Sequence, residues 1–501
     1  MKYIIGIDIG TGSTKAVAVN TSGDAVHTEQ VSYPTLHPEP NYSEQAPELI
    51  WQAFIKCIQR TVTALKAEPT AIALSSAMHS LIPVDKNGDP LMNMITWADN
   101  RSSSIAKQIK DSDDGDTIYE KSGTPIHAMA PICKIIWLRE NKEDLFKQVY
   151  KFISIKELVW FKLFGAYEVD HSIASATGLF DIVKLNWNPL SIKLCAIRED
   201  MLSSPVPVDH VRQGVKVDIL KTVANVPFLI GGSDGCMANI GSCAIEPGVA
   251  ALTIGTSGAI RVANSKPTYN HKAMTFNYCL FPDLYISGGP INNGGVALKW
   301  YIESFLKQKL DSPDRYSEVL SELDNTKAGA DGLIFLPYLL GERAPIWNSD
   351  SSGVFFGIRN YHTQAHFTRA VIEGISMALF SIAKAMEDGG LSIQKIHASG
   401  GFTNTRAWIQ ILADIFGKKF YLLNSEDASA LGAAYLAMKK LDLIKEYAEL
   451  KPLSSSPIES SPIEPNLKNH HAHQRTFELY DRLYKKLKEE MLLVEDLRDP
   501  D

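Results

Sequence analysis

The sequence has none of the features that are typical of membrane proteins or nucleic-acid-binding proteins. Its 501 residues contain no uninterrupted apolar stretch of about 20 residues, which is the length needed to span a membrane. Lysine and arginine form no dense run and the formal net charge is −7, so nucleic acid is not an expected partner. Asp8 interrupts the apolar run at the start, so we expect no secretion signal and a cytoplasmic location.

Cysteine is scarce and scattered. The six cysteines form no Cys-x-x-Cys pair, and we expect reduced thiols at positions 57, 133, 195, 236, 243 and 279. Three histidines near the end of the chain lie in no recognisable helix or hairpin, and we expect them to be exposed to solvent rather than bound to metal: His470, His471 and His473.

Two familiar phosphate-binding loops are also absent. No Gly-Lys-Ser/Thr is present, which excludes a Walker A loop, and position 15 is lysine where a dinucleotide fingerprint beginning at Gly10 needs glycine. The segment "GIDIGTGSTK" (6–15) is nevertheless rich in glycine and threonine. Because a Val-rich run and a turn follow it, we predict a strand over 3–8, a tight turn over 10–13 and a return strand over 15–19. Backbone N–H groups of such a turn can converge on a phosphate.

The length and the alternation of elements predict an α/β protein with two domains. Strand-like runs such as 71–80 alternate with helix-like runs such as 47–65. A chain of 501 residues is too long for one core. The pattern "IDIGTGSTKAVAV" (7–19) returns as "LTIGTSGAIRVA" (252–263), about half the chain later. We therefore predict domains over 1–245 and 246–501, each opening with a similar hairpin.

The two copies differ at one position that has chemical meaning. Asp8 in the first copy corresponds to Thr253 in the second. One Mg²⁺ held between two clamped phosphates needs one hard carboxylate, and a second carboxylate would repel the phosphates. Asp8 is therefore the candidate metal ligand.

Two further glycine turns lie between a strand-like and a helix-like run. "HASGGFTN" (397–404) precedes a helix expected from about 404, and "INNGGVALKW" (291–300) has the same frame. Gly400 and Gly401 would let a flat ring or a sugar approach the backbone, and Gly295 and Asn404 are further candidate nucleotide contacts. The alternative is an ordinary turn with nothing bound.

Three segments carry side chains suited to a small polar ligand. Asp234 ends a strand just before the second hairpin, where a carboxylate can accept a proton from an attacking hydroxyl; an ordinary Asp-Gly turn is the alternative. Met78 and His79 end the run 71–80, and another strand is followed by Trp97, Asp99 and Arg101. These side chains suit a ligand with C–H faces, hydroxyls and a carboxylate, the alternatives being a Trp at the edge of the core and a surface ion pair.

Two long segments resemble signatures of the FGGY family of carbohydrate kinases. They are "MAPICKIIWLREN" (129–141) and "GVFFGIRNYHTQAHFTRAVIEG" (353–374), and the resemblance extends over nearly the full chain. It implies a ribonuclease-H-like domain in each half, as in the actin-like ATPase superfamily, with a cleft between the domains for ATP and Mg²⁺.

The resemblance also implies roles for individual residues. The catalytic base falls on Asp234, the substrate contact on Met78 and His79, and the nucleotide-contacting glycines on Gly400 and Gly401. The phosphate loops fall on two sets: Asp8, Gly10, Thr11, Gly12, Ser13 and Lys15 in the first, and Gly255, Thr256 and Ser257 in the second. Many members have Thr or Ser where Gly12 stands, so here a backbone N–H would replace a hydroxyl contact.

Several segments, among them "SAMHS", "ITWADNR" and "PINNGG", are most similar to gluconate kinases, which implies a sugar acid as substrate. An unpaired carboxylate in a cleft is unfavourable, so such a site needs a cation. The candidates are Arg101, His79, His127 and Lys156. Xylulose kinases share Met-His and remain the nearest alternative, and an actin-like or chaperone-type ATPase without a small substrate is the alternative from another class. A homodimer is compatible with the sequence.

Overall fold

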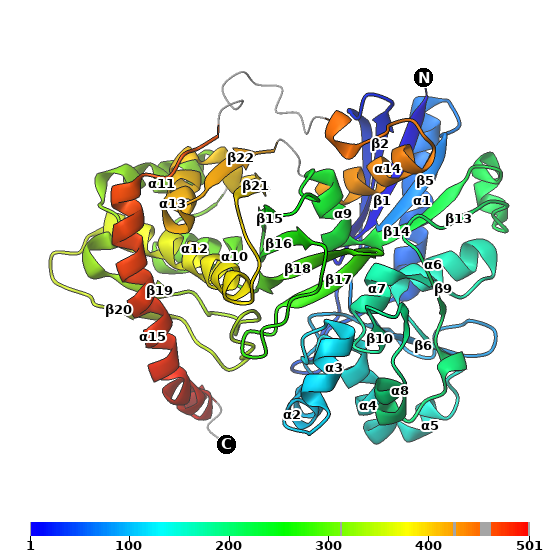
Figure 1. The fold of residues 1–501 in the computed structure, drawn as a ribbon, viewed down its shortest axis with the longest axis horizontal. Helices are drawn as coiled ribbons and strands as arrows, with labels where there is room; N and C mark the ends of the chain where they lie inside the picture. The colour runs from blue at the N-terminus through cyan, green and yellow to red at the C-terminus, as the bar shows by residue number, and fades with distance from the viewer. Residues whose placement is uncertain (1, 311–312, 424–426, 451–461, 499–501) are drawn as a thin grey trace.

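The computed structural model describes residues 2–310, 313–423, 427–450 and 462–498, and it contains two six-stranded sheets (Figure 1). The strands of the first sheet, in spatial order, are β13 (Val211–Arg212), β14 (Phe228–Ser233), β5 (Ala71–Ser76), β1 (Tyr3–Ile9), β2 (Ser13–Asn20) and β3 (Ala25–Ser32). Those of the second are β17 (Phe276–Phe281), β18 (Leu284–Ile291), β16 (Gly258–Asn264), β15 (Val249–Ile254), β21 (Lys395–Ser399) and β22 (Lys419–Leu422).

The two sheets repeat one arrangement. In the first, β14, β5 and β1 run parallel, and β2 and β3 continue antiparallel. In the second, β22, β21 and β15 run parallel, and β16 and β18 continue antiparallel. Each half therefore has the ribonuclease-H-like arrangement, and the α/β class with two such domains is confirmed. The boundary between 245 and 246 stays a prediction.

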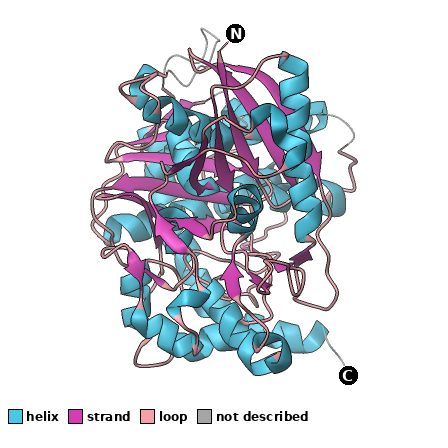
Figure 2. Ribbon diagram, turned by 90° about the vertical axis from the view of Figure 1, so that its right-hand side faces the viewer, coloured by secondary structure: helices cyan, strands magenta, loops and turns pink. Residues whose placement is uncertain are grey.

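Helices cover the strands of both halves, as Figure 2 shows. In the first half they are α1 (Pro47–Leu65), α2 (Ser103–Lys110), α3 (Gly115–Ser122), α4 (Pro131–Asn141), α5 (Glu143–Phe146), α6 (Ile155–Phe164), α7 (His171–Ser175), α8 (Pro189–Cys195) and α9 (Asp234–Gly241). In the second they are α10 (Gly295–Trp300), α11 (Pro313–Leu320), α12 (Gln364–Asp388), α13 (Arg406–Phe416), α14 (Ala428–Lys440) and α15 (Leu467–Arg498).

Short strands pair outside the main sheets. They are β4 (Glu44–Gln45), β6 (Ile82–Val84), β7 (Met94–Ile95), β8 (Lys151–Ile153), β9 (Glu168–Asp170), β10 (Phe180–Asp181), β11 (Asn186–Trp187), β12 (Ser204–Val206), β19 (Ile334–Leu336) and β20 (Val354–Phe356). Most of them lie in the long insertion between β5 and β14, which forms the lower part of the first half in Figure 1. This insertion brings the loops around residues 79, 97 and 127 to the site.

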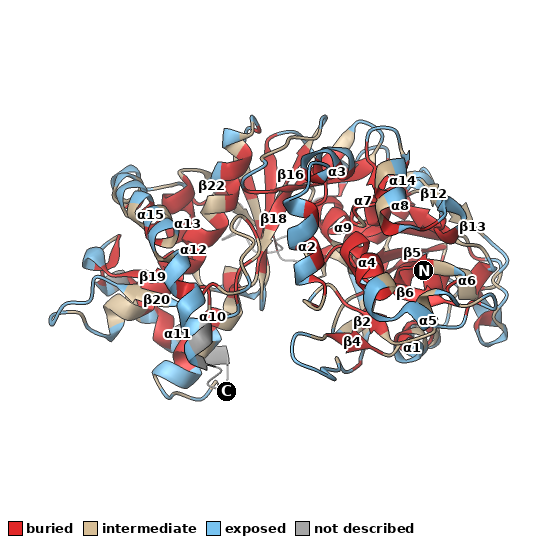
Figure 3. Cartoon of the chain, turned by 90° about the horizontal axis from the view of Figure 1, so that it is seen from below, coloured by how far each residue is buried: buried red, intermediate tan, exposed pale blue. Residues whose placement is uncertain are grey.

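Each half has its own core, and the buried segments lie inside each half in Figure 3. The strand "YIIGIDI" is apolar on both faces because it is covered on both, a pattern typical of central strands. On one face it shares a core cluster with α1 through Phe54 and Ile58. On the other face α14 approaches Gly6, where an added Cβ would lie 1.9 Å from the Ala430 carbonyl oxygen.

The helices α9 and α14 join the two halves. They cross with their backbones in contact, because glycine occupies both crossing points: a Cβ on Gly432 would lie 1.8 Å from the Met237 carbonyl oxygen, and one on Gly241 would lie 2.0 Å from that of Ala428. Figure 1 shows α14, from late in the chain, beside β1 from its start. One buried cluster accordingly combines residues of both sheets with residues of both helices.

Several expectations from the sequence can now be compared with the structure. The helix at 47–65 and the hairpin at 3–19 are confirmed. The strand expected over 71–80 ends at Ser76, and His79 has a left-handed φ of 64° that turns the chain out of the sheet. The helix expected from about 404 begins at Arg406, after the short 3₁₀ helix Gly401–Asn404. All six cysteines are free, and among the described helices none is long and apolar enough to cross a membrane.

The expectation that the three late histidines lie outside a helix is wrong, and the expectation that they are exposed holds for His471 alone. They lie in the long helix α15, and His473 is only 1% exposed, with its Nδ1 atom 3.9 Å from the Glu373 carboxylate. Of the three, only His471 is exposed and His470 is half-buried. The reason is that α15 packs against α12 and α13, a tertiary contact that the local pattern does not reveal.

Candidate active site

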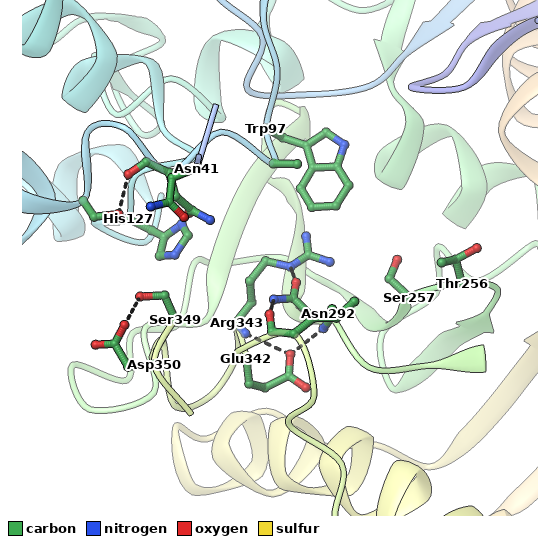
Figure 4. A pocket seen from close by; sticks show the side chains of 14 residues that line it. Asn41, Trp97, His127, Thr256, Ser257, Asn292, Glu342, Arg343, Ser349 and Asp350 are labelled. Atoms are coloured by element: carbon green, nitrogen blue, oxygen red, sulfur yellow. Dashed lines mark hydrogen bonds between the residues drawn. The ribbon is translucent and has the colours of Figure 1, made fainter. Parts of the chain in front are cut away.

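Two adjoining cavities lie where the two halves meet. One, of about 410 Å³, is lined by Lys15 after the first hairpin turn, by Gly255 of the second turn, by Asp234 and by Gly400 and Gly401. The other, of about 770 Å³, is lined by Thr256 and Ser257 of the same second turn and by residues of both halves around Trp97 (Figure 4). We call them the phosphate-side cavity and the sugar-side cavity. Because consecutive residues of one turn line both, the cavities are neighbours.

The second hairpin turn is built by close backbone packing. Gly255 N–H donates to the Ser257 carbonyl, and Gly295 N–H at the start of α10 donates to the Gly255 carbonyl at 2.7 Å. A Cβ on Gly294 would lie 2.6 Å from the Ser257 oxygen, so glycine is needed for this approach. In this structure the backbone of Gly295 therefore stabilises the second hairpin turn through its hydrogen bond to Gly255.

The third glycine turn borders the phosphate-side cavity as expected. Gly400 has a φ of 115°, and a Cβ there would lie 2.7 Å from the Ile254 carbonyl oxygen. Gly401 has open space where a Cβ would be. Asn404 ends the short helix after it and is not among the described residues that line this cavity.

Two carboxylates interact electrostatically near the phosphate-side cavity, Asp8 and the cavity-lining Asp234. Asp8 Oδ1 accepts a hydrogen bond from Ser75 Oγ at 2.8 Å, and burial, followed by the negative charge of Asp234, raises the pKa of Asp8 to about 7. Burial also raises the pKa of Asp234, while Arg261 acts in the opposite direction. Asp234 begins α9, and its Oδ1 accepts from the Gly235 N–H at 2.6 Å.

Lys15 spans the boundary between the two halves. Its Nζ lies 2.5 Å from Asp427 Oδ1, just before α14. This pair holds the lysine beside the cavity, where its positive charge lowers the pKa of Asp8.

Sequence reasoning missed Arg261, which lines the phosphate-side cavity from β16. Its Nη1 atom makes a long contact of 3.4 Å with Thr253 Oγ1, and its buried Nε atom has no hydrogen-bond partner among the described residues. The signal available in the sequence was a lone charge in the otherwise apolar run "GAIRVA".

The sugar-side cavity contains a second arginine that sequence reasoning missed. The guanidinium of Arg343 lies over the ring of Trp97, 4.5 Å from its centroid, and Figure 4 shows both side chains at the cavity. Trp97 Nε1 donates to Thr11 Oγ1 at 2.8 Å, which ties the indole to the first hairpin turn.

Met78 lies beside the start of α9, next to Asp234, and His79 is held by its own hydrogen bonds. A Cβ on Gly235 would lie 3.3 Å from Met78 Cε. Both ring nitrogens of His79 are engaged, Nδ1 with the Ala176 carbonyl at 2.7 Å and Nε2 with the Tyr278 hydroxyl at 3.1 Å. Burial lowers the pKa of His79 to about 3, so its ring is neutral at physiological pH.

Asp99 and Arg101 are brought together, but away from both cavities. The Arg101 guanidinium donates to Asp99 and to Glu44, each at 2.7 Å, and its side chain is only 2% exposed. It also lies 3.7 Å from the centroid of the Tyr42 ring. Neither Asp99 nor Arg101 is among the described residues that line the cavities, so their polar groups serve the loop after Trp97.

The long signature segments contribute internal support. Lys134 Nζ donates to the carbonyls of His79 at 2.5 Å and Thr96 at 2.7 Å, which joins the two sugar-side loops. Glu373 pairs with Arg369 at 2.6 Å inside the second half. The first segment therefore positions the loops of the sugar side, the second stabilises the second half, and neither is part of the described lining of the two cavities.

Taken together, the geometry is that of two domains with two adjoining polar cavities at their junction. Profiles of the two domains of the FGGY family of carbohydrate kinases match residues 3–241 and 250–441. A gluconokinase of Bacillus subtilis is 38% identical over 481 residues, which is 93% of each chain.

Two solved structures resemble the chain over almost all of its length. The gluconate kinase of Lactobacillus acidophilus has a TM-score of 0.91 at 33% identity and covers 97% of this chain and 98% of its own. The ligand-bound xylulose kinase of the same organism has a TM-score of 0.92 at 33% identity and covers 97% and 99%. The chain belongs to the FGGY family of carbohydrate kinases, and it is an ATP-dependent phosphotransferase for a small sugar or sugar acid.

Proposed function

We propose that the protein transfers the γ-phosphoryl group of ATP to the primary hydroxyl of D-gluconate, giving ADP and 6-phospho-D-gluconate. The observation that carries this proposal is the position of Asp234. Its carboxylate borders the phosphate-side cavity, next to the second hairpin turn and close to Met78 on the sugar side. A base for phosphoryl transfer has to lie between the two substrates in this way.

The nucleotide occupies the phosphate-side cavity in this proposal. The β- and γ-phosphates lie between the backbone N–H groups of the two turns, formed by Gly10, Thr11, Gly12 and Ser13 and by Gly255, Thr256 and Ser257, with Lys15 beside them. Gly401, with open space at its Cα, allows the nucleoside to lie against the backbone beside Gly400.

Asp8 has the surroundings expected of a Mg²⁺ ligand. Asp8 is half-buried within electrostatic reach of a second carboxylate, and one of its oxygens accepts from Ser75 while the other has no described partner. A divalent cation would relieve the repulsion that raises the pKa of Asp8, and Mg²⁺ takes such oxygen ligands. When bound there, Mg²⁺ supplies positive charge that stabilises the triphosphate.

Asp234 acts as the general base. Its carboxylate accepts the proton of the C6 hydroxyl as that oxygen attacks the γ-phosphorus, and ADP leaves from the opposite side. Because burial raises the pKa of Asp234, its carboxylate is a stronger base than an exposed aspartate, while the positive charge of Arg261 favours its ionised form. Closure of the two halves would exclude water from this step.

Gluconate is preferred over xylulose as the substrate because the Bacillus subtilis gluconokinase is 38% identical, whereas a xylulose kinase of Staphylococcus xylosus is 30% identical. Xylulose stays the alternative because the two Lactobacillus structures match equally well in sequence.

The test is a panel of gluconate, xylulose, ribulose, glycerol and fuculose with ATP and Mg²⁺. The proposal expects the largest kcat/KM for gluconate. A larger value for xylulose would assign the enzyme to the alternative substrate, and ATP hydrolysis unaffected by any of the five would contradict a sugar kinase altogether.

A further inference from the structure

We propose that Arg343 is the residue that binds the acidic group of the substrate, so that a guanidinium of the second half selects a sugar acid in a cavity lined by residues of both halves. This inference rests on the proposed function and assigns the cation that gluconate requires.

The four cations considered from the sequence are not available for this role. Arg101 is bound by Asp99 and Glu44, and Lys156 lies 2.5 Å from Asp170 with both side chains almost fully buried. The ring nitrogens of His79 are engaged. His127 does line the sugar-side cavity, but burial and the charge of Arg343 lower its pKa to about 3, so it carries no charge at neutral pH.

Arg343 has both charge and unused donors. Its Nε donates to Asn292 Oδ1 at 2.7 Å and its Nη2 to the Ile291 carbonyl at 3.1 Å, and both acceptors are neutral. A guanidinium has five N–H donors in a planar fork, so further donors remain for a ligand. Among the ion pairs of the described residues none involves Arg343, and burial lowers its pKa only to about 10.

The adjacent Glu342 does not neutralise this charge by direct pairing. Its Oε1 accepts from the backbone N–H groups of Asn292 and Arg343, and its Oε2 accepts from Asn293 Nδ2 at 3.1 Å. Glu342 is 1% exposed and therefore fixes the backbone of the segment that presents Arg343. Figure 4 shows Arg343 extending from this segment toward Trp97.

Arg343 and Asp234 line the two adjoining cavities, Arg343 the sugar-side cavity and Asp234 the phosphate-side cavity. The positive charge of Arg343 lowers the pKa of Asp234, so the two lie within electrostatic reach, yet they form no ion pair within 4.0 Å. Gluconate has its reacting hydroxyl at one end and its carboxylate at the other, and the proposal places the hydroxyl at Asp234 and the carboxylate at Arg343. A bidentate pair between guanidinium and carboxylate fits the planar fork, and a ketose has no group for it.

The same contact would couple binding to closure. Arg343 belongs to the second half, while Trp97, on which it stacks, is tied to Thr11 of the first half. A carboxylate bound by Arg343 would therefore connect the two halves around the substrate.

The experiment compares gluconate with D-gluconamide, its uncharged analogue, in the wild type and in Arg343→Gln, Arg343→Lys and Arg261→Gln. We expect Arg343→Gln to lose about 10²-fold or more in kcat/KM for gluconate, since truncating one partner of a buried charged pair has an effect of that size, and to change little with gluconamide. Gluconate binding without ATP, followed by tryptophan fluorescence, should weaken in parallel. Arg261→Gln, on the phosphate side, should slow both substrates by the same factor.

Three results would overturn the inference. Arg343→Gln that loses activity equally for both substrates would mean a structural role, and a selective loss in Arg261→Gln would move the carboxylate site to that residue. If Arg343→Gln does not fold, as judged by a loss of ADP affinity, the test uses Arg343→Lys instead. An equal change in kcat/KM for both substrates in that variant also refutes the inference. A wild-type enzyme that prefers xylulose to gluconate contradicts the proposed function itself. A wild-type enzyme that prefers gluconate, together with an Arg343→Gln variant whose ratio of kcat/KM for gluconate and gluconamide is unchanged, contradicts only this inference.

Discussion

Replacing Asp8 by asparagine is expected to stabilise the metal-free protein while it removes activity. The Asp8 carboxylate is buried opposite Asp234, and burial together with that charge raises its pKa from 3.8 to about 7. Asparagine has the same shape, can accept the same hydrogen bond from Ser75, and carries no charge to repel Asp234. The conflict is therefore inherent in the proposed site, in which one carboxylate binds Mg²⁺ and the other acts as the base.

The size and the pH dependence of this effect follow from proton linkage. Between pH 3.8 and about 7 the folded protein holds a proton on Asp8 that the unfolded chain has lost, so the free energy of unfolding falls as the pH rises. At about 1.4 kcal/mol for each pH unit, the loss is about 1.7 kcal/mol at pH 5 and about 4.5 kcal/mol at pH 8. The asparagine side chain does not titrate, so the stabilisation by Asp8→Asn should be about 3 kcal/mol larger at pH 8 than at pH 5.

The assay is thermal unfolding of both proteins at the two pH values, in EDTA and without nucleotide. Asp427→Asn is the control, because Asp427 has Lys15 as a cation partner at 2.5 Å and its removal should give no gain at pH 8. Equal effects of Asp8→Asn at both pH values, or a lower midpoint at pH 8, would refute the reasoning. With MgATP present the order should reverse, because the bound cation favours the carboxylate.

Three further predictions concern the base, the helix crossing and a buried cation. Asp234→Asn should lower kcat by roughly 10²–10⁴-fold with unchanged ATP affinity, measured by initial rates and by equilibrium binding; near-normal turnover would exclude this base. Gly432→Ala should lower the unfolding temperature markedly, because its Cβ would lie 1.8 Å from the Met237 oxygen; an unchanged midpoint would contradict the close crossing of α9 and α14. Arg101→Gln should reduce the free energy of unfolding by about 3–5 kcal/mol, because it leaves Glu44 and Asp99 without their cation. It should leave the ratio of gluconate to xylulose activity unchanged, and a changed ratio would mean that Arg101 contributes to the substrate site.

Local patterns were sufficient for the elements that carry the phosphate-side site. The hairpin at 3–19 and the glycine turns at 255–257 and 400–401 could be predicted because a tight turn demands particular residues at particular positions. Asp234 could be proposed because it follows a strand at the junction of two repeats. The position of Asp8 and the family also follow from short segments of the chain.

The sugar side could not be predicted in the same way. Trp97, Asp99 and Arg101 have the residue types of a ligand site, yet only Trp97 reaches a cavity, because Glu44 and Asp99 enclose the guanidinium of Arg101. Arg343 has no distinctive local pattern, and it lies beside Trp97 only after the two halves are assembled.

The sequence by itself determined the α/β class, the repeated hairpins, the candidate base and the membership of a kinase family, since these depend on residues close together in the chain. Only the tertiary structure decided which charged side chains are paired with one another and which are left to meet a ligand. The physical reason is that the pairing and burial of a charge depend on neighbours brought from distant parts of the chain, as Arg343 and Trp97 are, and no local pattern encodes those neighbours.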